Sequence, residues 1–194
     1  MTVRPLCIAL FAALAVPSFV AAQAQHAHVH GQAFVDVAVD AGVVEINLRA
    51  TAQDLVGFER DAATPEEEAQ VLAARKAVLD HARLWQFNAA ARCVAEGPVL
   101  EVPGAGEAHD HDHSHDHDHD HDHDHDHDHD HVAHSDWTVR YRFRCAAPEA
   151  LRAIDSGMFA VFPSLQSATV QVLDATGARE ETLTASANRL ALAQ

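Results

Sequence analysis

Two stretches near the start of the chain repeat apolar side chains with a period of two. Alanine or valine stands at every odd position of residues 33–39, and Val44, Ile46 and Leu48 follow the same rule. Asp40-Ala41-Gly42 between them is a turn sequence. Since side chains of a strand alternate between its two faces, the pair predicts a β-hairpin with one buried face.

A helix start follows at Thr64. Thr64 suits the N-cap, Pro65 suits the first helical position, and Glu67 completes a capping box. We expect a helix over residues 65–83 that packs through an apolar stripe, with two aromatic residues just past it in the core. The stripe comprises Val71, Leu72, Val78 and Leu79, and the aromatic residues are Trp85 and Phe87.

The strongest strand pattern occupies residues 137–145, where large apolar residues alternate with one threonine and three arginines. We interpret the arginine face as solvated; attraction of acidic residues is the alternative. Weaker patterns predict a short strand over 91–94, a short helix over 148–154 and an aromatic packing segment over 158–163. Further strands are expected around 170–172, 179–184 and 190–192. The order ββαβ and then βαββ predicts an α+β fold: a small antiparallel sheet with one main helix and one short helix, interrupted by a His/Asp-rich loop.

That loop dominates the composition. The 194 residues include 17 His, and 13 Lys plus Arg stand against 29 Asp plus Glu, for a net charge of -16. Residues 109–131 alone hold 12 His and 10 Asp. Such acidity argues against binding to nucleic acid or to an anionic membrane. Residues 109–131 have no apolar side chain to bury, so we expect this tract to be disordered without metal.

The first 24 residues read as a signal peptide. Arg4 precedes an apolar run over 6–20, and small residues suit cleavage near Ala22 or Ala24. A membrane anchor is the alternative, although about 15 apolar residues fall short of the roughly 20 that span a bilayer. We expect residues 25–96 to be the first half of a single α+β domain, 97–135 the loop, and 136–194 the second half.

Two cysteines remain after cleavage. In an oxidising compartment, Cys93 and Cys145 are expected to form a disulfide. Because it closes a loop of about 50 residues, this bond should stabilise the folded state by roughly 4 kcal/mol. A zinc site built on two cysteines is the competing interpretation.

The alternating loop has the chemistry of a metal binder. Imidazole nitrogen with carboxylate oxygen suits Zn²⁺, Ni²⁺, Co²⁺ and Cu²⁺ rather than Ca²⁺ or Mg²⁺. A solubilising linker is the alternative. Protons should displace the metal as the pH falls. The expected ligands are His109, His111, His113, His115, His117, His119, His121, His123, His125, His127, His129, His131 and the adjacent His134, with Asp110, Asp112, Asp116 and Asp118.

A second cluster opens the mature chain. If His26, His28 and His30 extend the first strand, they share one face, and three His plus water make a zinc site. Three solvated histidines are the alternative.

His81 suits a structural role near a helix end. No motif of a hydrolase, kinase or dinucleotide enzyme occurs, so we expect no enzyme.

Several features occur together in one known family: HAHVHG just after the signal peptide, DLVGFE at 54–59, a helix with acidic residues in its first turn, cysteines flanking the His-rich insert, and MFAVFP at 158–163. The mature chain resembles the zinc-regulated periplasmic proteins of Gram-negative bacteria that are associated with zinc uptake. The resemblance implies a periplasmic zinc-binding protein that assists import beside the periplasmic binding protein of a zinc ABC importer. The family often has His directly after GFE, whereas this chain has Arg60; only Glu59 is carried over as a candidate ligand.

The favoured hypothesis is therefore a periplasmic protein that captures or buffers Zn²⁺ and assists its uptake without covalent chemistry. The alternatives are a buffer for Ni²⁺, Cu²⁺ or Co²⁺ in metal tolerance, and a metal-dependent enzyme. The chain has no Met-rich run, which argues against specialisation for copper(I).

Overall fold

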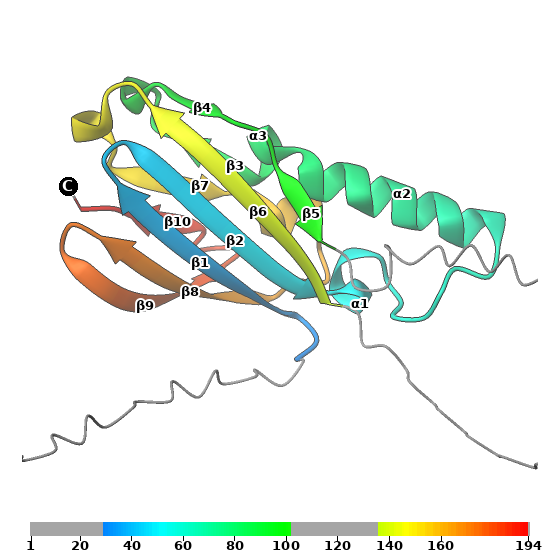
Figure 1. Ribbon diagram of the computed structural model, residues 1–194. Coiled ribbons are helices and arrows are strands. Elements are labelled where there is room, and N and C mark those ends of the chain that lie inside the picture. Colours follow the sequence, from blue (N-terminus) through cyan, green and yellow to red (C-terminus); the bar gives the residue numbers. More distant parts are fainter. Residues whose placement is uncertain (1–28, 102–135, 194) are drawn as a thin grey trace, which may run out of the picture.

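The predicted hairpin is present in the computed structural model, which describes residues 29–101 and 136–193 (Figure 1). Strands β1 (Gln32–Asp40) and β2 (Val43–Thr51) pair antiparallel from Phe34 opposite Arg49 to Asp40 opposite Val43. Ala41 and Gly42 make the turn with φ of 45° and 82°. Two consecutive residues with positive φ match the right-handed twist of the paired strands, which explains the turn sequence.

Helix α2 (Pro65–Leu79) begins as expected but ends four residues early. The Thr64 side chain accepts a hydrogen bond from the Glu67 N–H at 3.2 Å, which confirms the N-cap. At the other end Asp80 leaves the helical conformation and caps α3 (His81–Leu84) by accepting the Arg83 N–H. The expected stripe is also wrong in part. Val78 is buried, whereas Leu72 and Leu79 are 65% and 38% exposed.

The large sheet joins seven strands of the described residues. Its order is β4-β6-β2-β1-β8-β9, and β5 also pairs with β6. The additional strands are β4 (Cys93–Ala95), β5 (Val99–Glu101), β6 (Asp136–Cys145), β8 (Ser167–Asp174) and β9 (Gly177–Thr184).

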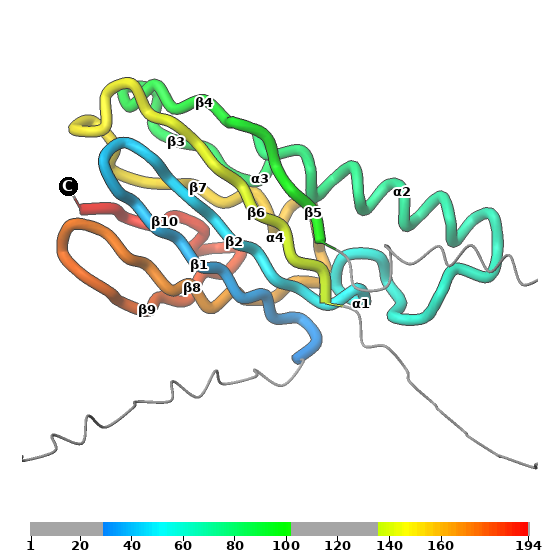
Figure 2. Tube along the Cα trace, viewed as in Figure 1, coloured from blue at the N-terminus to red at the C-terminus, as the bar shows by residue number. Residues whose placement is uncertain are grey.

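The sheet is mixed, so the prediction of a small antiparallel sheet was wrong. Strands β1 and β8 run parallel, from Gln32 beside Ser167 to Ala38 beside Leu173 (Figure 2). Parallel pairing needs a long crossover. The connection from β1 to β8 here includes two strands of a second sheet and α4 (Met158–Val161), and the sequence pattern did not predict that sheet.

The second sheet lies behind the large one (Figure 1). It has the order β10-β7-β3, with β3 (Trp85–Phe87), β7 (Ala153–Ser156) and β10 (Arg189–Ala191). The short helix expected over 148–154 is only the 3₁₀ turn η2 (Pro148–Ala150), since the following residues pair in β7. The strand expected over 91–94 starts at Cys93, because the 3₁₀ turn η1 (Ala89–Ala91) and Arg92, with φ of 52°, precede it.

The core lies between the two sheets and is closed by the helices. It receives one face of β1, β2, β6 and β8, while the other face of the large sheet stays exposed. Trp85 is buried and Phe87 packs against the core, as expected. The face of β6 that is buried consists of Trp137, Val139, Tyr141, Phe143 and Cys145.

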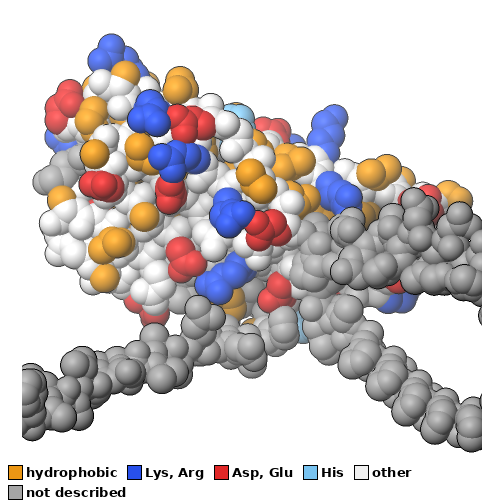
Figure 3. All heavy atoms as spheres, viewed as in Figure 1, with side chains coloured by type: hydrophobic (Ala, Val, Ile, Leu, Met, Phe, Trp, Pro, Cys, Tyr) orange, Lys and Arg blue, Asp and Glu red, His pale blue; other side chains and the backbone are white. Residues whose placement is uncertain are grey.

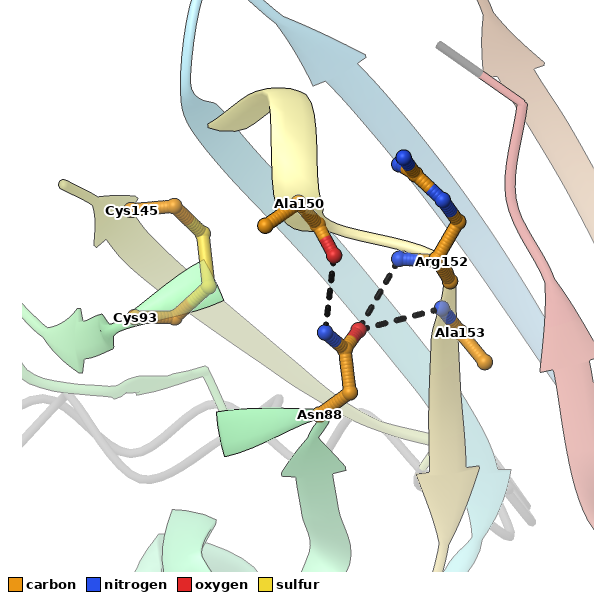
Figure 4. Close-up of a disulfide and its surroundings, with 6 residues drawn as sticks. All are labelled: Asn88, Cys93, Cys145, Ala150, Arg152 and Ala153. Atoms are coloured by element: carbon orange, nitrogen blue, oxygen red, sulfur yellow. Dashed lines mark hydrogen bonds between the residues drawn. A yellow bond between two sulfur atoms is a disulfide. The ribbon is translucent and has the colours of Figure 1, made fainter. Parts of the chain in front are cut away.

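Cys93 and Cys145 form the predicted disulfide (Figure 4). The two residues stand opposite each other in the pairing of β4 with β6. Nearby, the Asn88 side chain links two segments: its amide donates to the Ala150 carbonyl at 2.8 Å, and its oxygen accepts the Arg152 N–H at 2.9 Å. The disulfide therefore fixes β4 on β6, and Asn88 fixes the segment after β3 to the start of β7.

Candidate functional site

Gly31 joins two sequence motifs, HAHVHG and DLVGFE, to the start of β8. Its N–H donates to the Asp54 carboxylate at 2.8 Å, and its carbonyl accepts the N–H groups of Gln166 and Ser167 at 2.8 and 3.1 Å. A Cβ on Gly31 would lie 3.3 Å from the Gln166 side chain, at a φ of +80°. The segment before β1 is therefore fixed by residues just after β2 and just before β8.

Asp54 is the buried anchor of this arrangement. It is 5% exposed and belongs to α1 (Ala52–Leu55), which Thr51 caps. The Thr51 hydroxyl donates to Asp54 Oδ2 at 3.0 Å, while Oδ1 accepts the Gly31 N–H. Both carboxylate oxygens thus bind the protein itself. This role of Asp54 was not predicted from the sequence, although the spacing Thr51-x-x-Asp54 is that of a capping motif.

His30 and Glu59 lie side by side next to this anchor. The His30 Nε2 atom is 3.8 Å from a Glu59 carboxylate oxygen. The His30 side chain is 56% exposed and that of Glu59 is 14% exposed. Two ligands at about 2.1 Å from a tetrahedral zinc stand about 3.4 Å apart, so a small movement brings both groups to one ion.

His30 does not extend β1, as the sequence analysis expected. It lies in a turn, because Val29 O accepts the Gln32 N–H at 3.2 Å and Gly31 takes a positive φ. His26 and His28 lie outside the described residues.

The ends of the His/Asp-rich loop reach the body at this same end of the sheet. Asp136 begins β6 opposite Thr51, the residue that caps α1. Glu101 ends β5 opposite Thr138. Residues 102–135 are therefore joined to the body close to Asp54 and the segment that carries His30.

The other predicted ligands cannot be placed. His109, His111, His113, His115, His117, His119, His121, His123, His125, His127, His129, His131, His134, Asp110, Asp112, Asp116 and Asp118 all lie outside the described residues. Within residues 29–101 and 136–193, no group of three or more His, Cys, Asp or Glu side chains is arranged to hold a metal ion. His81 begins α3 and its ring contacts Phe143 edge-on, with ring centres 6.0 Å apart.

The exposed face of the large sheet carries a shallow groove of about 720 Å³. Figure 3 shows positive and negative side chains next to one another on this side of the molecule. Arg142 pairs with Glu45 and Glu96, and Arg140 pairs with Glu101. Because these arginines already have acidic partners, the groove resembles a solvated, ion-paired surface rather than a charged ligand site.

The model of the ZrgA family zinc uptake protein matches this chain over residues 27–192. This chain belongs to the ZrgA family. The matched residues include Gly31, Asp54 and Gln166 and also the insert between β5 and β6. Comparison with curated proteins gives no match. In the described residues of this ZrgA-family chain, no helix is long and apolar enough to cross a membrane.

Proposed function

We propose that this protein binds Zn²⁺ in the periplasm, captures or buffers it, and passes it to the periplasmic binding protein of a zinc importer. It performs no covalent chemistry; zinc is its cargo. Membership of a zinc uptake family supports the zinc role. The signal-like N-terminus and the histidines of the chain support the location and the capture step.

One observation carries the proposal: an imidazole and a carboxylate meet at the end of the sheet to which the His/Asp-rich loop is joined. His30 and Glu59 are 3.8 Å apart, and Asp136 stands opposite Thr51 beside their anchor. Zinc accepts nitrogen and oxygen ligands together. In this proposal the loop collects ions, and His30 with Glu59, His26 and His28 holds one ion more tightly.

The anchor has a defined part in this function. A site held by a mobile terminus loses affinity, because each ligand must be ordered when the ion binds. The hydrogen bonds of Gly31 to Asp54 and Gln166 fix the backbone beside His30 before any ion arrives. Asp54 is thus a positioning residue and not a ligand.

Zinc competition with a chromophoric chelator tests the proposal. We compare the mature protein with a form that lacks residues 109–131, and in that form we introduce His30→Ala and Glu59→Gln. One zinc ion should survive the deletion, and each substitution should weaken its binding at least about tenfold. His81→Ala is the matched control, because His81 is a histidine of the body whose ring contacts Phe143, near the other end of β6 from Asp136, and it should leave zinc affinity unchanged.

Two outcomes would overturn parts of the proposal. If all zinc binding vanishes with residues 109–131, the loop is the sole binder and the site at His30 and Glu59 is wrong. If Ni²⁺ or Cu²⁺ binds far more tightly than the usual affinity order predicts while Zn²⁺ binds weakly, the protein is a buffer for another metal.

A further inference from the structure

Helix α2 carries a second apolar stripe that faces away from the core. Its inner side packs through Ala74 and Val78, which are buried. Leu72 and Leu79 are 65% and 38% exposed, and Ala69 is exposed on the same side, one turn before Leu72. Figure 1 shows α2 running beyond the end of the large sheet, and Figure 3 shows hydrophobic side chains on the surface in that region.

Charged residues flank this stripe in a particular order. Glu68 lies one turn before Leu72 and Lys76 lies one turn after it, and both are exposed. Leu72 is the middle residue of the fifteen in α2. The N-terminal turn is acidic throughout, whereas the basic residue of the last turn is Lys76.

The charges of two copies of α2 are complementary to each other only when the two helices run antiparallel. If two copies of α2 pair antiparallel about a two-fold axis at Leu72, Glu68 of each copy stands opposite Lys76 of the other. Pro65 then stands opposite Leu79, so apolar residues also meet at both ends. A parallel pair would place Glu68 against Glu68 and Lys76 against Lys76, which repel. Antiparallel helices also place opposite ends of their dipoles together.

We propose that α2 is a contact surface for a second copy of this chain, which binds antiparallel with Leu72 at the centre. The contact is isologous, as two-fold symmetry requires. A helix of fifteen residues is about 22 Å long, and two such helices bury less area than the roughly 1,200 Å² of a stable interface. The dimer is therefore concentration-dependent, with a Kd in the micromolar range or above.

Sedimentation velocity of the mature protein over a range of concentrations tests this proposal. The buffer contains EDTA, so that histidines of two chains are not bridged by metal. The wild type should shift from monomer to dimer as concentration rises, and Leu72→Glu should stay monomeric. Leu173→Glu is the matched control: Leu173 is 55% exposed on β8, in the groove of the opposite sheet face, and its substitution should leave the Kd unchanged.

A charge exchange then tests the orientation. Glu68→Lys and Lys76→Glu should each raise the Kd about fivefold or more, because each places like charges together, and the double variant should return the Kd to within about twofold of wild type. Far-UV circular dichroism establishes that each variant keeps its helix. A wild type that remains monomeric at millimolar concentration would overturn the proposal. So would a Leu72→Glu variant that dimerises as well as wild type, or a double variant that fails to recover.

Discussion

Among the glycines that the structure describes, Gly157 has the least room for a side chain. A Cβ at this position would lie 1.9 Å from the Arg83 carbonyl oxygen. The Gly157 N–H also donates to the Leu84 carbonyl at 2.9 Å, so the two backbones are held together. Its φ of -90° is open to any residue, and the need for glycine therefore comes from packing and not from backbone conformation.

Gly157→Ala should lower the free energy of unfolding by about 3 kcal/mol, because either the Arg83 carbonyl or the start of α4 must move. Urea denaturation measures the loss. Gly57→Ala is the control: Gly57 has a φ of +108° but nothing within 4 Å of its Cβ position, so only backbone strain of about 1–2 kcal/mol is expected. A smaller loss for Gly157→Ala than for the control would contradict the packing argument.

Asp174 is a second residue whose contribution to stability depends on its hydrogen-bond partners. Its side chain is fully buried and accepts hydrogen bonds from Thr176 Oγ1 and Arg179 Nη1, both at 2.6 Å, from Thr176 N at 3.0 Å and from Ala193 N at 3.1 Å. Burial alone would raise its pKa, but these hydrogen bonds outweigh burial and hold the pKa well below its usual range. Asp174 therefore ties the end of the chain to the turn between β8 and β9 as a carboxylate.

Asp174→Asn should cost about 2 kcal/mol of unfolding free energy at pH 7, since one charge-assisted acceptor is lost. Because the folded-state pKa is depressed, this stabilisation is present above the ordinary carboxyl pKa and is lost as pH falls through the lower folded value. Urea denaturation from pH 7 downward should show the wild type converging on the variant only in acid. A difference that is constant over the whole pH range would contradict this account.

At the scale of elements, Arg60 has a clear structural partner. Its guanidinium forms a two-pronged ion pair with Glu67 in the first turn of α2, and the Ala63 N–H donates to the same carboxylate at 2.7 Å. The hydrogen bond from Arg60 lowers the pKa of Glu67 to about 2. Arg60 thus fixes the loop that precedes α2.

Arg60→Ala should raise the pKa of Glu67 toward its usual value, because the strongest hydrogen bond to the carboxylate is removed. A carboxyl-carbon NMR titration follows this single group directly. Arg83→Ala, which removes a charge at the other end of the helical region, should leave the Glu67 midpoint in place. An unchanged midpoint in Arg60→Ala would show that the ion pair does not persist in solution.

The elements also show what the sequence can predict. Strands with one buried face were found because period two is a local signal: β1, β2 and β6 all match it. The buried face of α2 was not predicted correctly, because that helix is apolar on two sides. Val78 faces inward while Leu72 and Leu79 are exposed. A pattern alone does not tell which apolar side the core takes when both sides could pack.

For the whole molecule, the disulfide closes the segment between β4 and β6, with 52 positions separating its cysteines. Replacing Cys93 and Cys145 with Ala should lower the free energy of unfolding by about 4 kcal/mol, as chain entropy predicts for a loop of this size. Urea denaturation of the mature protein measures the loss. Deleting residues 109–131 with the disulfide intact is the control and should change stability much less. A loss below about 1 kcal/mol in the double variant would contradict the entropic account.

The arrangement of strands that are distant in the sequence could not be predicted from the sequence pattern. The parallel pairing of β1 with β8 joins strands that are far apart in the chain, and local periodicity has no information about direction. The candidate site also combines features that the sequence predicts with a contact that it does not. His30 and Glu59 were both named from motifs, but the Asp54 anchor depends on a contact with Gly31, 23 residues away.

The position of the insert has one more consequence. Strands β5 and β6 pair antiparallel directly beside it, with Glu101 opposite Thr138, so the whole His/Asp-rich segment is topologically a long hairpin loop. Doubling the length of a flexible loop costs only about 0.6 kcal/mol, because closure entropy grows with the logarithm of length. The number of His-Asp repeats can therefore change in evolution almost independently of the stability of the folded body.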